Sequence, residues 1–328
     1  MGKPISIERI LVVRMSALGD CFCAIPVFAA LREQYPKAHI AWAIQDNFAP
    51  LIQNLRGLDE LIIFPRQRWK HSPISLQWKE GNKLWRHLRM RNFDAVVDVQ
   101  SNTKSGFISF LTQAPMRIGH GQGEAKELST WFTNCKVNHP PQLKHIIYKN
   151  LNLLTALGIE QAEPEFPLPA DPFAQAKVIH WLNTQGVIPG RFLLLVPFCG
   201  RPEKEWPPEK YMQLSHRLAE NHIPGVFLQS PGKEKETQAM LPSSTREHIH
   251  FAPPTTILEM VEFIRQAKVC FGGDTGPLQI AGGLGIPNVA CFGPTDPDRL
   301  RPLGDSTVIP LQSDTATVMR IVNEKMNA

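Results

Sequence analysis

Long apolar runs are missing from this chain of 328 residues. No run approaches the roughly 18 to 20 apolar residues that span a bilayer. The first eight residues are polar and lead directly into a short apolar run at residues 10–13, so the N-terminus lacks the apolar segment of a signal peptide. We therefore expect a soluble, cytoplasmic protein.

Metal-binding and common nucleotide-binding motifs are also missing. The six cysteines include no C-x-x-C pair, which argues against zinc and thioredoxin-like sites. The absence of G-x-x-x-x-G-K-[ST] and of G-x-G-x-x-G after a strand weighs against ATPases, kinases and dehydrogenases. Asp296 and Asp298 spell D-x-D, but Pro297 between them favours a rigid turn. We predict no metal ion and no cofactor.

Positive charge is concentrated in one segment. Residues 65–91 contain eight Lys and Arg against a single Glu, a local surplus larger than the +5 of the whole chain. The basic residues are Arg66, Arg68, Lys70, Lys79, Lys83, Arg86, Arg89 and Arg91, with Trp69, Trp78 and Trp85 between them. This mixture suits an anionic, amphipathic partner, either a phosphorylated glycolipid or a membrane surface, although a solvated loop and helix face would look similar. No nucleic-acid-binding motif accompanies the charge, so we expect no nucleic acid partner.

Short apolar runs alternate with amphipathic stretches in two series. The first series has a predicted strand at 9–14 followed by a helix at 20–34, and the second begins with a strand at 192–196. Continuous apolar strands separated by helices indicate parallel sheets covered on both faces. A proline-rich linker at 158–171 separates the series. We predict an α/β protein with two doubly wound Rossmann-like domains, residues 1–165 and 173–310. We expect a C-terminal helix within 311–328 to pack back on the first domain.

Two turns between a strand and a helix carry chemistry-bearing residues. Ligands bind at the carboxyl ends of strands in open α/β sheets. Asp20 lies at the start of the first helix, where a carboxylate can cap the helix or act as a general base. The turn at 272–277 is rich in glycine, and Asp274 and Thr275 in it precede a predicted helix. The amino end of that helix would favour a phosphate. The alternative is an ordinary turn between a strand and a helix. Lys204 follows the first strand of the second domain, where a lysine could neutralise a diphosphate or simply be solvated.

Five segments, in order, resemble motifs of glycosyltransferase family 9, the heptosyltransferases. Residues 16–20 are similar to the family's S-x-L-G-D, and residues 204–207 to its K-x-W-P loop. Residues 230–234 resemble its G-x-x-x-E turn with serine at the first position, residues 274–276 its D-[ST]-G loop, and residues 292–297 its F-G-P-T-D-P element. The resemblance extends from about residue 10 to residue 304.

The resemblance implies a GT-B fold, in which the two domains face each other across a cleft. It implies that the N-terminal domain binds a phosphorylated glycolipid acceptor, Kdo-lipid A or the inner core of lipopolysaccharide, and that the C-terminal domain binds ADP-heptose. Transfer would be metal-independent and would invert the anomeric carbon. It would occur in the cytoplasm, peripherally at the inner face of the cytoplasmic membrane.

The resemblance also assigns roles to individual residues. Asp20 becomes the general base, and Lys204 becomes a catalytic cation that holds the leaving diphosphate. The donor-binding residues would include Glu234 at the ribose and Asp274, Thr275 and Gly276 at the diphosphate. Gln279, Cys199 and Gly200 would also bind the donor. The acceptor-binding residues would be Ser16, Gly19, Arg66, Arg68, Lys70 and Arg117.

The chain departs from the family pattern at two places. Gln279 stands where the family usually has a histidine, and glutamine can donate a hydrogen bond but cannot become cationic. Cys199 and Gly200 stand where small hydroxyl residues are common. Two alternatives to heptose transfer therefore stay open, namely a transferase that uses another nucleotide sugar and a protein that binds sugar nucleotides or glycolipids without catalysis.

Overall fold

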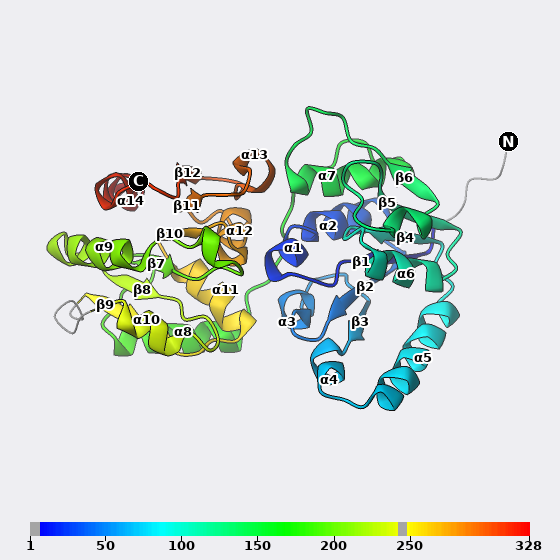
Figure 1. The fold of residues 1–328 in the computed structure, drawn as a ribbon, viewed down its shortest axis with the longest axis horizontal. Helices are drawn as coiled ribbons and strands as arrows, with labels where there is room; N and C mark the ends of the chain where they lie inside the picture. The colour runs from blue at the N-terminus through cyan, green and yellow to red at the C-terminus, as the bar shows by residue number, and fades with distance from the viewer. Residues whose placement is uncertain (1–6, 242–247) are drawn as a thin grey trace. The chain divides into compact units, whose positions relative to one another are not determined.

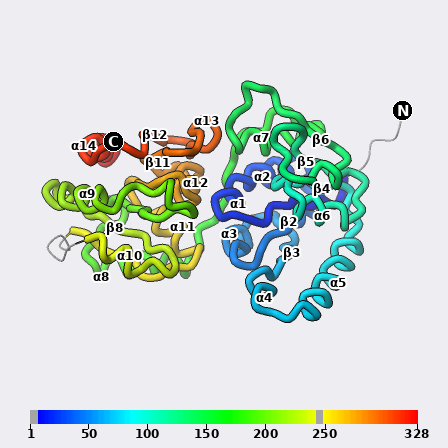
Figure 2. Tube along the Cα trace, viewed as in Figure 1, coloured from blue at the N-terminus to red at the C-terminus, as the bar shows by residue number. Residues whose placement is uncertain are grey.

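The computed structural model describes residues 7–241 and 248–328. The chain divides into two compact units, Met1–Pro169 and Ala170–Ala328, and the division falls inside the proline-rich segment (Figures 1 and 2). Each unit contains one six-stranded parallel sheet. Among the described residues, no helix combines the length and the apolar character needed to cross a membrane.

The first unit is a doubly wound α/β domain with the strand order β3-β2-β1-β4-β5-β6. Residues 10–13 of the central strand β1 are buried, and Leu11 pairs with Ala41 and with Val96 on its two sides. This explains the continuous apolar run, because both faces of a parallel sheet are covered. The strands are β1 (Arg9–Val13), β2 (His39–Gln45), β3 (Glu60–Phe64), β4 (Ala95–Asp98), β5 (Met116–His120) and β6 (Cys135–Val137). The α-helices are α1 (Leu18–Phe22), α2 (Ile25–Gln34), α3 (Ala49–Ile52), α4 (Arg66–Lys70), α5 (Ile74–Met90), α6 (Thr103–Leu111) and α7 (Ile146–Asn152).

The helix predicted over residues 20–34 is in fact two helices. The first, α1, ends at Phe22, and α2 begins at Ile25 with Pro26 in its first turn. Proline has no amide hydrogen, so Pro26 cannot donate the bond to Phe22 that a continuous helix requires. The break leaves a short, separate helix directly after β1.

The second unit repeats the architecture with the order β12-β11-β10-β7-β8-β9. Its strands are β7 (Leu193–Val196), β8 (Gly225–Phe227), β9 (Ile249–Phe251), β10 (Val269–Gly273), β11 (Asn288–Phe292) and β12 (Ser306–Pro310). Its α-helices are α8 (Pro172–Thr184), α9 (Pro208–Glu220), α10 (Glu234–Ala239), α11 (Ile257–Gln266), α12 (Gly276–Gly283), α13 (Pro297–Leu300) and α14 (Thr315–Asn327). Trp206 and Tyr211 are fully buried in its core and pack edge to face, with ring centroids 5.0 Å apart.

The terminal helix α14 packs on the second unit, whereas we expected it to pack on the first. It contacts α9, β10 and β11. Val318 and Val322 are fully buried in the same core cluster as Trp206 and Tyr211. These valines are four residues apart and form an apolar stripe that complements α9. An ion pair between Lys325 and Asp305 adds a polar attachment within this unit.

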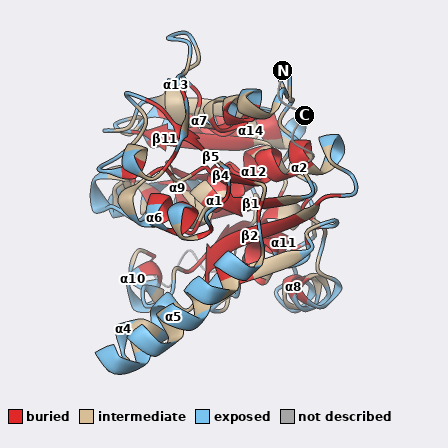
Figure 3. Ribbon diagram, turned by 90° about the vertical axis from the view of Figure 1, so that its right-hand side faces the viewer, coloured by how far each residue is buried: buried red, intermediate tan, exposed pale blue. Residues whose placement is uncertain are grey.

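The basic, tryptophan-bearing segment forms α4 and α5. Although α5 has 17 residues, Leu88 is its only buried side chain. Figure 3 shows α4 and α5 largely in the colours of exposed and half-buried residues, unlike the red strands. Since an amphipathic helix normally buries one face, the exposed apolar side chains of α5 require an explanation.

Candidate functional site

Asp20 lies at the carboxyl edge of the first sheet, in α1 directly after β1. Its Oδ2 atom is 2.7 Å from Nη2 of Arg14 and accepts a hydrogen bond of 3.2 Å from the amide of Ala17. Arg14 is held in turn by donation from Nη1 to the carbonyl of Val99 at 3.1 Å. The Asp20 side chain nevertheless stays 45% exposed. The carboxylate is therefore oriented by a helix cap and an ion pair, yet accessible to a ligand.

A polar cavity of about 640 Å³ lies beside this edge. Ser16, Arg66 and Lys70 line it together with Gln45, Asn47 and Gln77. Within residues 7–241 and 248–328, neither Arg66 nor Lys70 forms an ion pair with a carboxylate, so both cations can meet an anionic ligand. The structure thus brings together three of the predicted acceptor residues.

The other predicted acceptor residues lie elsewhere. Gly19 is in the first turn of α1, one residue before Asp20. Arg68 pairs with Glu80 at 2.7 Å, and Glu80 also accepts a 2.6 Å bond from the Trp69 indole. The Trp69 bond, followed by the charge of Arg68, lowers the pKa of Glu80. These contacts join α4 to α5.

Arg117 is not at the ligand-binding edge. It is the second residue of β5, close to the amino end of the strand. Its guanidinium donates to the carbonyl of Ala114 at 2.7 Å and to that of Phe132 at 2.9 Å. The prediction that Arg117 contacts the acceptor is therefore at odds with its position, because a parallel sheet binds ligands at the opposite edge.

Two buried titratable residues at the carboxyl edge were missed by the sequence analysis. Asp98 ends β4 and accepts bonds from the amide of Ser101 at 2.8 Å and the hydroxyl of Ser105 at 2.9 Å. Burial raises the pKa of Asp98 to about 6. His120 ends β5 with Nδ1 2.7 Å from Nε2 of His139, and burial together with His139 lowers its pKa to about 3. A carboxylate inside the apolar run at residues 95–99 was the available indication for Asp98.

Lys204 and Asp274 form an ion pair in the second unit. The Lys204 Nζ atom lies 2.6 Å from Asp274 Oδ2, and the side chains are 16% and 7% exposed. Lys204 belongs to a short 3-10 helix, Pro202–Lys204, in the loop after β7. A Cβ atom on Gly273 would lie 2.5 Å from the Lys204 carbonyl oxygen and 2.7 Å from Cys199 Sγ. Because Gly273 has no side chain, the loop that contains Cys199 and Lys204 packs directly against the end of β10.

The turn after β10 leads into the amino end of α12. Thr275 is the N-cap residue, and its side chain makes no capping bond. Gly276 is the first helical residue. The Thr275 hydroxyl and the Gly276 amide can therefore bind an anion beside the Lys204–Asp274 pair, whereas Pro277 has no amide hydrogen to donate.

Gln279 is buried and bonded within the protein. Its Nε2 atom donates to the carbonyl of Leu300, which ties α12 to the end of α13. This is the nitrogen that we expected to donate to a phosphate oxygen. Asp296, at the start of α13, accepts a 2.9 Å bond from the amide of Asp298, so the D-x-D segment forms a helix cap.

The remaining predicted donor residues surround the carboxyl ends of β7 and β8. Burial, reinforced by Glu205 and Asp274, raises the pKa of Cys199 to about 12, so its thiol is neutral. Gly200 is exposed, and a Cβ atom there would meet nothing within 4 Å. Glu234 begins α10 and accepts a 3.0 Å bond from the amide of Gly232. Its own amide, followed by that of Gly232, lowers the pKa of Glu234.

Comparison with known proteins identifies the family. A family model described as glycosyltransferase family 9 (heptosyltransferase) matches residues 82–326. The chain belongs to this family. This membership confirms the predicted resemblance to family 9 and makes the protein a glycosyltransferase.

Individual family members are similar to this chain, in sequence or in structure, over almost its whole length. Lipopolysaccharide heptosyltransferase 1 of Escherichia coli K12 is 24% identical to the transferase over 308 residues, which cover 92% of each protein. The structure of a family 9 glycosyltransferase from Veillonella parvula has a TM-score of 0.81 at 17% identity and covers 98% of this chain and 97% of its own. The E. coli heptosyltransferase WaaC with ADP-2-deoxy-2-fluoro heptose has a TM-score of 0.77 at 22% identity and covers 98% and 100%. The predicted GT-B fold is confirmed.

Proposed function

We propose that this transferase moves heptose from ADP-heptose to the inner core of lipopolysaccharide, with inversion and without a metal ion. The observation that carries the proposal is the placement of Lys204 and Asp274 beside the open amino end of α12. The related E. coli protein was solved with a fluorinated ADP-heptose, and the E. coli K12 relative is a lipopolysaccharide heptosyltransferase. Both support ADP-heptose as the donor.

On the donor side, the chemical task is to neutralise the leaving diphosphate. The Lys204 ammonium, the Thr275 hydroxyl and the Gly276 amide would bind its oxygens as negative charge develops. Asp274 holds the lysine in place through the 2.6 Å ion pair. Glu234 would accept hydrogen bonds from the ribose hydroxyls. With the leaving group stabilised in this way, no metal ion and no general acid are required.

On the acceptor side, Asp20 would remove the proton from the attacking hydroxyl. Arg14 fixes the position of the carboxylate at 2.7 Å. Arg66 and Lys70 would bind the phosphate and carboxylate groups of a Kdo-lipid A acceptor in the polar cavity, where Ser16 adds a hydroxyl. A single displacement from the opposite side of the sugar inverts the anomeric carbon. We place the reaction at the inner face of the cytoplasmic membrane, where the protein would bind peripherally to reach a lipid acceptor.

The test is donor binding followed by transfer. Purified protein in EDTA is titrated calorimetrically with ADP, ADP-heptose, UDP-glucose and GDP-mannose. We expect the two adenine nucleotides to bind and the other two to bind much more weakly. Incubation with ADP-heptose and Kdo-lipid A should then yield the heptosylated lipid. Preference for another nucleotide would exclude heptose as the substrate, and binding without turnover would favour a non-catalytic protein.

A further inference from the structure

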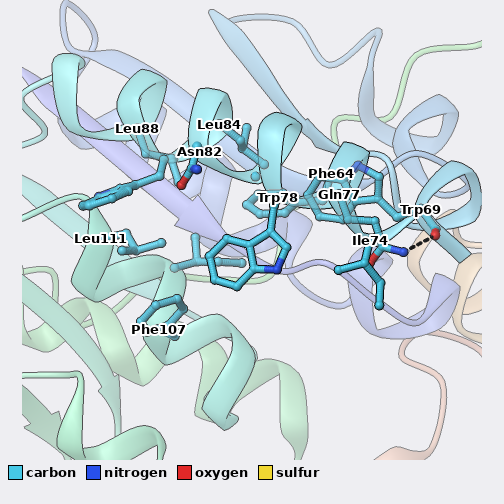
Figure 4. A pocket seen from close by; sticks show the side chains of 13 residues that line it. Phe64, Trp69, Ile74, Gln77, Trp78, Asn82, Leu84, Leu88, Phe107 and Leu111 are labelled. Carbon is cyan, nitrogen blue, oxygen red and sulfur yellow. Dashed lines mark hydrogen bonds between the residues drawn. The ribbon is translucent and has the colours of Figure 1, made fainter. Parts of the chain in front are cut away.

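An apolar groove lies between α5 and α6 in the first unit. Its volume is about 540 Å³, which is in the range of small-molecule sites. Its walls are mostly aromatic and aliphatic, and include Ile74, Trp78, Trp85, Phe107 and Leu111. In Figure 4, Trp78 from α5 and Phe107 and Leu111 from α6 lie around the same space.

The groove exposes large apolar side chains to solvent. Ile74 is 72% exposed, Trp78 is 69% exposed and Phe107 is 48% exposed. Two aromatic rings and an isoleucine lining one groove form a contiguous apolar surface, which usually marks a binding site. The cations Lys79, Lys83 and Arg86 of α5 are not among the residues that line the groove. The groove itself therefore matches an apolar chain.

The groove adjoins the polar cavity that Arg66 and Lys70 line. Trp69 and Gln77 line both spaces. Gln77 fixes this shared wall, because its Nε2 atom donates to the carbonyl of Trp69 (Figure 4) and to the carbonyl of Ser72, at 2.9 Å each. One amphipathic molecule could therefore place an anionic saccharide in the cavity and a hydrocarbon chain in the groove.

We propose that the groove between α5 and α6 is a subsite for an acyl chain of the glycolipid acceptor. The inference rests on the proposed function, since it assumes that the polar cavity holds the acceptor's saccharide. It explains why α5 buries only Leu88, because the apolar face of α5 is completed by the ligand. The groove would favour acylated acceptors over the same saccharide without chains.

Gly81 offers a way to fill the groove. It lines the groove on α5, and a Cβ atom there would meet nothing within 4 Å. A Gly81→Trp side chain would therefore occupy the space of the ligand without displacing the core. Met90 is on the same helix, is 77% exposed and is not among the residues that line the groove. Met90→Trp is thus a matched control that introduces the same side chain elsewhere.

The experiment measures the binding of Kdo-lipid A and of its fully deacylated form by calorimetry, below the concentration at which the lipid aggregates. We expect Gly81→Trp to raise the dissociation constant of the acylated acceptor at least about tenfold and to leave that of the deacylated form within about twofold. Met90→Trp should change neither. Phe107→Ser, on the opposite wall, should repeat the Gly81→Trp result and provides a second test if Gly81→Trp does not fold.

Equal effects of Gly81→Trp and Phe107→Ser on both acceptors, or no effect on either, would overturn the inference. So would loss of vesicle binding by these variants with unchanged affinity for the acylated acceptor, because the groove would then contact the bilayer. Turnover with ADP-heptose is measured separately. If the acylated acceptor binds as expected but receives no sugar, the proposed function fails while the acyl-chain subsite stands.

Discussion

Lys204 Nζ lies 2.6 Å from Asp274 Oδ2, and each side chain is largely shielded from solvent. The pair connects the loop after β7 to the turn before α12. It therefore has two roles to separate, one in holding these segments together and one in binding the donor diphosphate.

A double substitution separates the two roles of this pair. Lys204→Met leaves the Asp274 carboxylate buried without its partner, and we expect the free energy of unfolding to fall by about 3–5 kcal/mol. Adding Asp274→Asn removes the buried charge and should restore most of that loss. The value of kcat/KM should stay at least about 100-fold low in both variants, because the cation at the diphosphate is missing. Recovery of activity together with stability would show that Lys204 is only structural.

Gly273 controls where the lysine loop lies. In Gly273→Ala, the new methyl group would be 2.5 Å from the Lys204 carbonyl oxygen, so the loop must move. We expect kcat/KM to fall at least about tenfold, since a displacement near 1 Å is enough to misplace a charged group. Gly200→Ala is the comparison variant in the loop after β7, because its methyl group meets nothing within 4 Å and so should leave the Lys204 loop in place. Calorimetric ADP affinity and steady-state kinetics of both variants would test this, and equal effects would contradict it.

Asp20→Asn tests the general base with little disturbance of the fold. The asparagine side chain can still accept the bond from the Ala17 amide, and it loses only a half-exposed ion pair with Arg14. The free energy of unfolding should therefore fall by less than about 1 kcal/mol. We expect kcat to fall about 100- to 10,000-fold, as is typical when a general base is removed. ADP affinity, measured by calorimetry, should not change, and unchanged kcat would exclude Asp20 as the base.

The sequence predicted the architecture and the positions of the main turns for one physical reason. Strands covered on both faces are continuously apolar, so β1 and β7 stand out, and the residues after them lie at the carboxyl edge. This placed Asp20, Lys204 and the turn before α12 correctly at the ends of strands.

Long-range pairing was not predictable from local patterns. Arg68 looks free in the sequence, but Glu80 lies 12 positions away on the next helix and pairs with it. Arg117 falls in β5, whose sequence Met-Arg-Ile-Gly-His has no continuous apolar run, so this strand was not predicted. The helix α14 has an apolar stripe, but the stripe alone does not show which domain it covers. Each of these features depends on which surfaces meet after folding.

We expect Gln279 to stabilise the packing of α12 against α13 and not to contact the sugar nucleotide directly. Gln279→Ala removes the bond to the Leu300 carbonyl and leaves that oxygen unsatisfied, so we expect the free energy of unfolding to fall by about 1–3 kcal/mol. The dissociation constant of ADP-heptose should stay within about threefold. Chemical denaturation and calorimetry would be compared on the same preparation. A tenfold higher dissociation constant for ADP-heptose with an unchanged free energy of unfolding would instead show that Gln279 contacts a phosphate directly.

Asp98 and His120 should oppose each other in the pH dependence of stability. Burial raises the pKa of Asp98 from 3.8 to about 6, so between these values the folded state binds more protons than the unfolded state. The contribution of Asp98 to the free energy of unfolding therefore falls by up to about 3 kcal/mol as pH rises from 4 to 6. Burial lowers the pKa of His120 from 6.5 to about 3, so its contribution rises with pH in the same window.

Asp98→Asn removes one side of this balance. The amide oxygen can still accept from the Ser101 amide, whereas the ionisation is lost. We therefore expect the free energy of unfolding of Asp98→Asn to rise more steeply between pH 4 and 6 than that of the wild type, because the His120 contribution is no longer opposed. His120→Asn should have the opposite slope. Urea denaturation at pH 4, 5, 6 and 7 would measure the slopes. Parallel curves for Asp98→Asn and the wild type would mean that Asp98 titrates alike in the folded and unfolded chains.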